Sequence, residues 1–294
     1  MRAWLRGQRG EVGLVELLIG AAMMLGAVGA ALTVFETALP VDAETRERNT
    51  SQDQARTALD RLARQLRNLA SPTPDQPQAV DRATPFDVVF QSVDPVGPNA
   101  GTNAANVQRM RWCLDGGTPT ARLYLQTQTW TTAVAPAVPS ATACPGAGWS
   151  STRVVATDVA NRAADPDVPL FAVDGQSLLD VSALHAELVI DTDPGAGAPA
   201  TRLATGVFLR NQNRRPVAQF TATPSAKGIV LNGSLSSDPE GQELRYRWFD
   251  GAQEIGTGVV LTHPVPTGSG HQIRLEVSDP AGLTTSSGVQ ELLG

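Results

Sequence analysis

The chain has few of the residues on which most enzyme chemistry depends. Its 294 residues include three histidines and two cysteines. It contains no His-Glu-x-x-His zinc motif, no Gly-x-Ser-x-Gly nucleophile motif, no phosphate-binding Gly-Lys-Ser/Thr loop and no Cys-x-x-Cys pair. None of His185, His263 and His271 belongs to a recognisable catalytic triad in the sequence. We therefore predict that the protein is not an enzyme, with no catalytic residue and no cofactor.

Positive charge is also scarce. The chain has 23 Lys and Arg against 29 Asp and Glu, which gives a formal net charge of −6, and Lys227 is its single lysine. Proteins bind phosphate backbones chiefly through Lys and Arg, so an acidic chain is poorly suited to bind nucleic acid. We predict no nucleic acid partner, and we attach no functional meaning to the lack of lysine.

Long apolar runs are limited to one. Residues 17–35 carry no charge, and as a helix they would measure about 28 Å, close to the hydrocarbon thickness of a bilayer. Arg2, Arg6 and Arg9 precede the run, and basic residues on one side of a span keep that side in the cytoplasm. The sequence predicts a single-pass helix in the cytoplasmic (inner) membrane, with the bulk of the chain outside the cytoplasm.

Three interpretations of this run compete. A cleavable secretory signal has an apolar core of about 7–15 residues, and the small residues 27–31 that would mark its exit lie inside this longer run. A plain membrane anchor explains the length. Neither explains Glu16, which directly precedes Leu17, because a carboxylate at the start of a helix that enters lipid is costly and usually has a partner or a role.

Residues 14–19 read L-V-E-L-L-I and resemble the N-terminus of type IV prepilins and type II secretion pseudopilins. The resemblance implies that a basic leader, residues 1–10, is removed by the prepilin peptidase between Gly10 and Glu11. The new N-terminus would then usually be methylated, although Glu11 stands where the family usually has phenylalanine. It also implies that Glu16 pairs with the charged N-terminus of a neighbouring pilin subunit inside a filament.

Beyond the apolar run, the pattern predicts a helix followed by strands. Residues 42–68 are polar but periodic, which indicates an amphipathic helix packed on a domain. Its apolar stripe at helical spacing consists of Ala55, Leu59, Leu62, Leu66 and Leu69. Pro40 is expected to kink this long helix or to end its first half, and residues 75–82 read as a linker or loop. Alternating residues predict strands at 86–90, 107–114, 122–130, 184–191 and 202–210. In three of them one face is apolar: Met110, Trp112 and Leu114; Leu123 and Leu125; and Leu184, Ala186, Leu188 and Ile190. The order predicts an α+β unit, and the resemblance implies a pilin-like head, residues 42–213, with a long helix on an antiparallel sheet.

The two cysteines of the chain, Cys113 and Cys144, both fall in the head. Outside the cytoplasm, a pair of cysteines more often forms a disulfide than a metal site or a catalytic thiol, so we predict a disulfide. Two free buried thiols remain the alternative, because sequence alone does not prove pairing. His185 has no second His or Cys beside it, and we interpret it as a solvent-facing strand residue.

The character of the chain changes in residues 214–294, which we call the C-terminal module. Short alternating strands separated by turns are typical of an all-β immunoglobulin-like sandwich, and they are expected at 217–221, 229–232, 244–249 and 272–277. Trp248 is placed to be the core tryptophan of a central strand. The segments 233–241 (GSLSSDPEG), 246–248 (YRW) and 277–282 (VSDPAG) resemble PKD domains, which are immunoglobulin-like modules of extracellular and surface proteins.

Two Asp-Pro-x-Gly segments in the C-terminal module allow two interpretations. Asp-Pro and Gly supply the geometry of tight turns, which is the simpler one. The alternative is a weak Ca²⁺ site that uses Asp238, Glu240 or Asp279, because Ca²⁺ binds several carboxylate and carbonyl oxygens. Few acidic residues lie nearby, so we favour the turns and predict no metal site.

Together these features predict four segments. They are a leader (1–10), a transmembrane and assembly helix (11–41), the head (42–213) and the C-terminal module (214–294). The resemblance implies a non-enzymatic structural subunit, a minor pilin or pseudopilin, of a type IV pilus or type II secretion-like filament at the cell surface. Its partners would be other pilin subunits, the prepilin peptidase and the membrane. The alternative is a membrane-anchored surface protein whose C-terminal module recognises a polymer or another protein.

Overall fold

The structure is a computed structural model. It describes residues 13–93, 106–130, 132, 135–140, 142–163, 166–195 and 199–293, without the side chains of residues 34–44. The predicted cleavage positions, Gly10 and Glu11, lie outside the described residues. The chain divides into two compact units, residues 1–50 and 51–294, which we describe separately.

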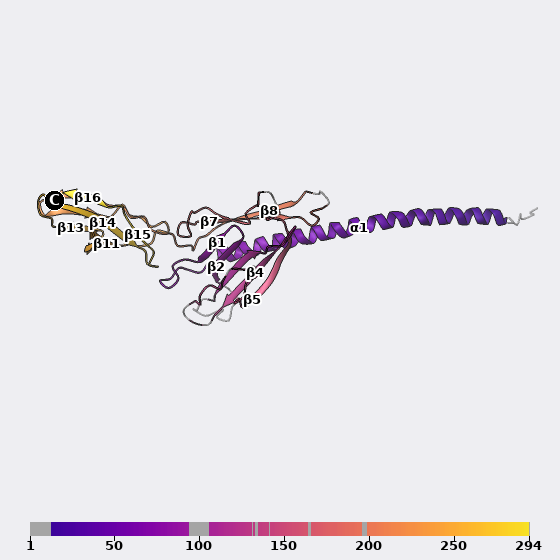
Figure 1. Cartoon of the computed structure of the whole chain (residues 1–294), viewed down its shortest axis with the longest axis horizontal. Helices are drawn as coiled ribbons and strands as arrows, with labels where there is room; N and C mark the ends of the chain where they lie inside the picture. Colours follow the sequence, from indigo (N-terminus) through magenta and orange to yellow (C-terminus); the bar gives the residue numbers. More distant parts are fainter. Residues whose placement is uncertain are drawn as a thin grey trace, which may run out of the picture. The chain divides into compact units, whose positions relative to one another are not determined.

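The chain begins with one long helix, α1, which spans Leu14–Arg67 and is drawn in indigo and purple in Figure 1. We predicted that Pro40 would kink this helix or end its first half, but α1 does not end there. Proline removes one hydrogen-bond donor from the helical ladder. The residues after it, 41–67, contain no further Pro or Gly, so they keep the helix intact.

The second part of α1 packs on the head through the predicted apolar stripe. All five residues of the stripe are buried: Ala55, Leu59, Leu62, Leu66 and Leu69. They share one core with the inward side chains of the head strands. Trp112 reaches the helix from the sheet, and its indole Nε1 donates a hydrogen bond to Gln65 Oε1 at 2.8 Å. Helix and sheet are thus joined by apolar packing and by a hydrogen bond that satisfies the buried indole.

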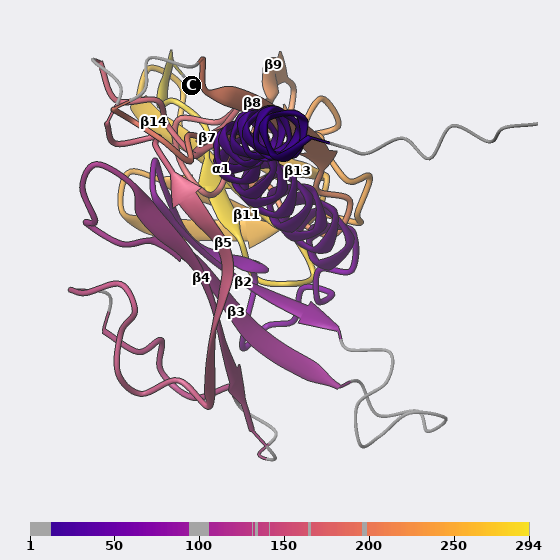
Figure 2. The ribbon, with the colours of Figure 1, turned by 90° about the vertical axis from the view of Figure 1, so that its right-hand side faces the viewer.

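The head sheet is antiparallel and has the order β1-β2-β3-β4-β5-β7-β6, with β8 paired to β7. Figure 2 shows β2, β3, β4 and β5 as neighbours. The strands are β1 (Val80–Thr84), β2 (Asp87–Val93), β3 (Val107–Leu114), β4 (Ala121–Thr129), β5 (Ser151–Val159), β6 (Phe171–Val173), β7 (Ala183–Ile190) and β8 (Thr201–Phe208). The structure thus agrees with the predicted fold class in having a long N-terminal helix and antiparallel sheets.

The predicted faces of three strands are confirmed. The residues expected in the core are buried: Met110, Trp112 and Leu114 on β3, Leu123 and Leu125 on β4, and Leu184, Ala186, Leu188 and Ile190 on β7. His185 is exposed, as predicted. In contrast, β1 occupies part of the segment expected to be a loop, and β5 and β6 were not predicted. β1 was missed because charged residues are expected to face solvent, whereas its Asp81 is paired with Arg109 inside the protein.

On the opposite face of β3, two charged side chains are buried in the interior of the protein. Arg109 is 2% exposed and Arg111 is 1% exposed. Arg111 contacts Asp87 with two nitrogens: Nε donates to Oδ1 at 3.0 Å and Nη2 donates to Oδ2 at 2.9 Å. Arg109 Nε donates to Asp81 Oδ2 at 2.9 Å. Each buried guanidinium therefore has a carboxylate partner, which offsets the cost of removing its charge from water.

A disulfide holds the segment that passes over these arginines. Cys113 on β3 is bonded to Cys144, as predicted, with 5.9 Å between the Cα atoms. Near it, the backbone of Gly146 donates to Gln126 Oε1 at 3.0 Å and accepts from Gln126 Nε2 at 2.8 Å. A Cβ atom at Gly146 would lie 2.7 Å from Arg111 Nη1. The disulfide therefore fixes a loop that closes over a buried ion pair.

Replacing Cys144 with serine is expected to lower the free energy of unfolding of the head by about 2–5 kcal/mol, as for native disulfides of small secreted domains. The loop that closes over Arg111 would lose its tether, so water would gain access to the buried guanidinium. Urea unfolding of the oxidised wild type and the variant measures the difference. Non-reducing peptide mapping should recover the linked pair, and full alkylation of both cysteines without reductant would contradict the prediction.

The C-terminal module has a three-stranded sheet in the order β13-β10-β9 and a five-stranded sheet in the order β12-β11-β14-β15, with β16 paired to β14. The strands are β9 (Thr221–Ser225), β10 (Gly228–Asn232), β11 (Arg245–Asp250), β12 (Gln253–Thr257), β13 (Val260–His263), β14 (Gly270–Ser278), β15 (Thr284–Ser286) and β16 (Gln290–Leu293). Two antiparallel sheets around one core are compatible with the predicted immunoglobulin-like sandwich.

Trp248 occupies the core of this module, as predicted. It is fully buried and packs edge-on against Phe220, with 5.3 Å between ring centroids. Its Nε1 donates to the carbonyl oxygen of Gly258 at 2.8 Å. The strand expected at 217–221 is displaced, because β9 begins at Thr221 and the preceding residues pair with the rest of the module through one isolated bridge. The periodicity of the sequence marks an extended segment, but it does not show at which residue that segment begins to pair with a neighbouring strand.

The border between the head and the C-terminal module is buried and polar. Gln212 accepts a hydrogen bond from the Val80 amide at 3.1 Å and donates to the Leu178 carbonyl at 2.9 Å. The next residue, Asn213, donates to Asp279 Oδ2 at 2.6 Å. Both border residues are at most 1% exposed. The buried amide side chains of these two neighbours therefore contact different parts of the chain, while Arg215 contacts the head again at Ser177 and Asp180.

Candidate functional site

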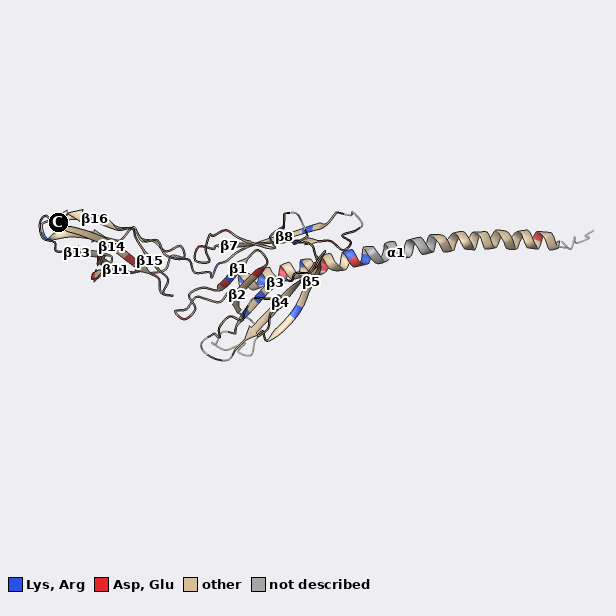
Figure 3. Ribbon diagram, viewed as in Figure 1, with Lys and Arg blue, Asp and Glu red and all other residues tan. Residues whose placement is uncertain are grey.

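The first candidate site is the start of α1. Leu14–Thr33 is long and apolar enough to cross a membrane, since its 20 residues would measure about 30 Å. By length and composition a signal sequence passes the same test. Figure 3 shows this segment in tan, with red for an acidic side chain near its start. The acidic residue in the first turn of α1 is Glu16, which is exposed.

The three weak calcium candidates are engaged by the protein itself. Asp238 Oδ1 accepts hydrogen bonds from the amides of Glu240 at 2.8 Å and Gln242 at 3.0 Å, which is turn geometry. Glu240 Oε1 lies 2.6 Å from Arg214 Nε, and Asp279 is 1% exposed and bonded to a backbone amide four residues on. Among the described residues, these carboxylates do not meet as a group of metal ligands. The hydrogen bonds of Asp238 are those of a tight turn.

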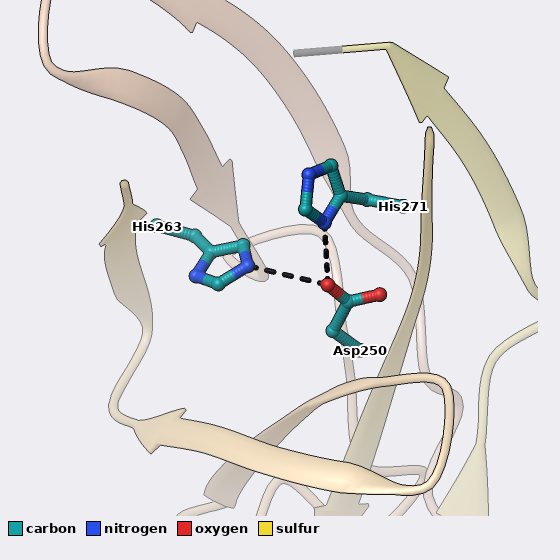
Figure 4. A group of neighbouring side chains, drawn as sticks. All are labelled: Asp250, His263 and His271. Atoms are coloured by element: carbon teal, nitrogen blue, oxygen red, sulfur yellow. Dashed lines mark hydrogen bonds and ion pairs between the residues drawn. The ribbon is translucent and has the colours of Figure 1, made fainter. Parts of the chain in front are cut away.

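A different group does meet in the C-terminal module, formed by Asp250, His263 and His271 (Figure 4). Asp250 ends β11, His263 ends β13, and His271 is near the start of β14. One ligand atom from each residue lies within 4.8 Å of the others. Since β13 belongs to the three-stranded sheet and the other two strands to the five-stranded sheet, the group bridges the two sheets.

The carboxylate of Asp250 stands between the two imidazoles. Its Oδ2 lies 2.5 Å from His271 Nδ1 and 3.4 Å from His263 Nε2. Its Oδ1 accepts a hydrogen bond from the Gln272 amide at 2.9 Å, which fixes the orientation of the group. The side chain of Asp250 is 23% exposed, that of His263 is 16% exposed and that of His271 is 13% exposed. The group is therefore sheltered but not fully buried.

The charge state of Asp250 follows from these contacts. Burial raises the pKa of Asp250, but hydrogen bonds from His271, from the Gln272 amide and from His263 lower it by more. The pKa of Asp250 therefore lies below its ordinary value, and the side chain is a carboxylate at neutral pH. The group offers one anionic oxygen and two aromatic nitrogens to a common point.

Ser269 holds the imidazole ring of His271 in its orientation. The Ser269 hydroxyl donates to the Pro266 carbonyl oxygen at 2.5 Å, and its oxygen lies 2.6 Å from His271 Nε2. The direction of this second hydrogen bond depends on the tautomer of the ring. The contact leaves Nδ1 of His271 facing the carboxylate of Asp250.

The order of contacts from Ser269 through His271 to Asp250 resembles that of a hydrolase triad. In a triad, however, the serine gives its hydrogen to the imidazole, whereas here that hydrogen is directed at a backbone carbonyl. We therefore assign no hydrolase chemistry to the group.

A hollow of about 480 Å³ lies in the head, beside Arg61, Arg64 and Arg153. The described residues that line it include no His, Cys, Asp or Glu.

Sequence reasoning did not bring this group together. Metal motifs are recognised by short spacings on one element, whereas these three ligand residues come from three strands in two sheets. One signal was available: two of the three histidines of the chain fall on the consecutive strands β13 and β14. The structure separates the third, His185, from them by placing it on β7.

Comparisons with known proteins concern one part of the chain. No family model and no curated protein matches the sequence. Among solved structures, the chain is similar to the PKD1 domain of Vibrio anguillarum Epp, at 21% sequence identity and a TM-score of 0.25. The match covers 28% of this chain and 95% of that one. Part of the chain thus has a structural neighbour of the PKD type.

Proposed function

We propose that this chain is a non-enzymatic structural subunit, a minor pilin or pseudopilin, of a type IV pilus or type II secretion-like filament. The start of α1 carries the proposal: Glu16 is the one charged residue in the exposed apolar segment Leu14–Thr33. The L-V-E-L-L-I run around it resembles the assembly helix of that family. The packing of the later part of α1 on an antiparallel sheet is consistent with the same resemblance.

The role proposed for Glu16 is to select the register of subunits in the filament. A carboxylate at the edge of an apolar span is costly unless a charge of opposite sign compensates it. The charged N-terminus of a neighbouring subunit would supply that compensation. Pairing these two groups stabilises a single stagger between helices, because any other stagger leaves both charges unpaired in a medium of low dielectric constant.

The C-terminal module would act as an additional interaction domain on this subunit. Its own buried core around Trp248 and its PKD-like sequence segments support a unit that is separate from assembly. A second candidate function uses the same features: a membrane-anchored surface protein whose module binds a polymer or another protein. The two functions differ in what happens to the N-terminus, because a simple anchor requires no prepilin peptidase.

Mature protein from membranes is expected to lack about the first ten residues and to retain the apolar helix, as the prepilin resemblance implies. The leader is basic, whereas the segment that follows the proposed cut is needed to hold the subunit in the membrane. Intact-mass measurement gives the mature N-terminus, and a further 14 Da, the mass of one methylene, would report methylation.

Gly10→Ala gives a matched control for this measurement, because it alters the proposed cut without changing charge or hydropathy appreciably. Its precursor should accumulate uncut in the membrane. A mature start near Ala31 would identify an ordinary secretory signal and would contradict the pilin proposal. An uncut wild-type chain would favour the anchored surface protein.

A further inference from the structure

The group formed by Asp250, His263 and His271 places three electron-pair donors around one point. His271 Nδ1 lies 2.5 Å from Asp250 Oδ2, and His263 Nε2 lies 3.4 Å from the same oxygen. One ligand atom of each residue lies within 4.8 Å of the others. Two imidazole nitrogens and one carboxylate oxygen, supplied by three strands, can therefore hold a cation between them.

We propose that Asp250, His263 and His271 bind a divalent transition-metal ion of the zinc type, which links the two sheets of the C-terminal module. Imidazole nitrogens suit Zn²⁺ and its neighbours in the first transition series. Ca²⁺ and Mg²⁺ prefer sites made of oxygen ligands, and this group offers one carboxylate. Three protein ligands leave the fourth tetrahedral position to water or to a group from solvent.

The spacing of the ligand atoms suits such an ion. Zinc bonds of about 2.0–2.1 Å in a tetrahedron place neighbouring ligand atoms about 3.3 Å apart. The distance of 3.4 Å between Asp250 Oδ2 and His263 Nε2 agrees with this value. The contact of 2.5 Å to His271 Nδ1 is shorter, so on binding these two atoms would separate by about 0.8 Å to reach the tetrahedral spacing. Rotation of a side chain supplies such a movement.

The groups behind the ligands are arranged as in a metal site. Metal-bound histidines usually donate their other ring N–H to a fixed acceptor, which sets both ring orientation and tautomer. The Ser269 oxygen lies at the place of such a partner, 2.6 Å from His271 Nε2, and its hydroxyl donates to the Pro266 carbonyl oxygen. The Gln272 amide holds the free oxygen of Asp250 in the same manner.

A metal at this position would cross-link the module. The two cysteines of the chain are both in the head, so no disulfide joins the sheets of the module. An ion held by β11, β13 and β14 would connect them instead. Because the ion binds the folded module and not the unfolded chain, it shifts the folding equilibrium toward the native state in proportion to its occupancy.

The test uses the full chain, purified in detergent without a polyhistidine tag and stripped of metal with EDTA. Zinc chloride is titrated by calorimetry, and bound metal is counted after gel filtration. We expect one zinc ion per chain in the wild type, and binding at least about tenfold weaker in His263→Ala and His271→Ala. Ser269→Ala should weaken binding by about 10–100-fold, the usual effect of losing the partner of a metal-bound histidine.

His185→Ala is the matched control, since it removes the exposed histidine of the head and should leave zinc binding unchanged. Zinc should raise the thermal midpoint of the module in the wild type and this control, and should not raise it in the His263 and His271 variants. Excess Ca²⁺ should not displace zinc.

Cobalt(II) provides a second readout, because a tetrahedral site gives it intense visible absorption that the ligand variants should lack. If a variant unfolds without metal, His263→Gln replaces it and the cobalt spectrum decides. A wild type that retains no zinc, or ligand variants that bind it as well as the wild type, would overturn the proposal. The group would then be a hydrogen-bonded imidazolium–carboxylate cluster.

Discussion

Replacing Asp87 with alanine is expected to lower the free energy of unfolding of the head by about 3–5 kcal/mol, the range found when one partner of a buried ion pair is removed. Arg111 is 1% exposed and donates hydrogen bonds to both carboxylate oxygens of Asp87. The variant would leave that guanidinium buried with Gln126 Oε1, at 3.0 Å from Nη1, as its remaining side-chain acceptor among the described contacts. Urea unfolding of the full chain is followed by tryptophan fluorescence in a Trp4→Phe, Trp248→Phe background, in which the remaining tryptophans, Trp112, Trp130 and Trp149, all lie in the head.

Two further variants distinguish the loss of a buried partner from the loss of a charge. Glu187→Ala breaks an ion pair whose arginine, Arg202, is 61% exposed, and it should cost less than about 1 kcal/mol. The double variant Asp87→Leu with Arg111→Met removes both charges and should recover much of the stability. A loss below about 1 kcal/mol for Asp87→Ala would show that Arg111 is compensated by other groups or by water.

Replacing Glu16 with alanine is expected to reduce incorporation of the chain into filaments by about a hundredfold or more, because an unpaired charge left inside an assembled bundle costs about 3 kcal/mol or more. In the proposed filament, the charge left behind is the N-terminus of the neighbouring subunit. Export and folding of the head should be unchanged, since Glu16 belongs to the unit 1–50 and the head core lies in 51–294. The chain in the sheared filament fraction, relative to the membrane fraction, measures incorporation.

Thr33→Ala is the matched control, because it changes a polar side chain in the same apolar segment and should leave incorporation unchanged. Glu16→Gln keeps the size of the side chain and removes the charge, so it should behave like the alanine variant. Deletion of residues 215–291 should leave incorporation intact. If Glu16→Ala assembles normally while that deletion abolishes assembly, the proposed role of Glu16 is wrong and the membrane-anchored binding protein becomes the better description.

The parts of the fold that could be predicted are those with one buried face. The stripe from Ala55 to Leu69 and the alternation on β7 are strong because water on one side and core on the other impose the helical and the two-residue periods. Trp248 was placed correctly for a similar reason, since a large aromatic residue in a short alternating strand is usually in the core.

Other parts could not be predicted, because charged residues are expected at the surface and several of them are buried in this protein. Arg109 and Arg111 on β3 look like solvent-facing residues, and the sequence does not reveal that Asp81 and Asp87 lie beside them. The same concealment applies to β1, where acidic and basic residues face partners within the protein. The ligand group of the C-terminal module was missed for a different reason: strand pairing, and not sequence spacing, brings together residues from three strands and two sheets.

The border at Gln212 and Asn213 has a consequence for how such modules are exchanged between proteins. All side-chain hydrogen bonds described above for Gln212 are made to the head, and that of Asn213 to Asp279 is made to the module. A crossover at the peptide bond between them would transfer each buried amide together with its own partners. A crossover a few residues later, at Pro216, would separate Asp279 from Asn213 and leave a buried carboxylate without its amide. A designed chimera would therefore tolerate the first cut better than the second.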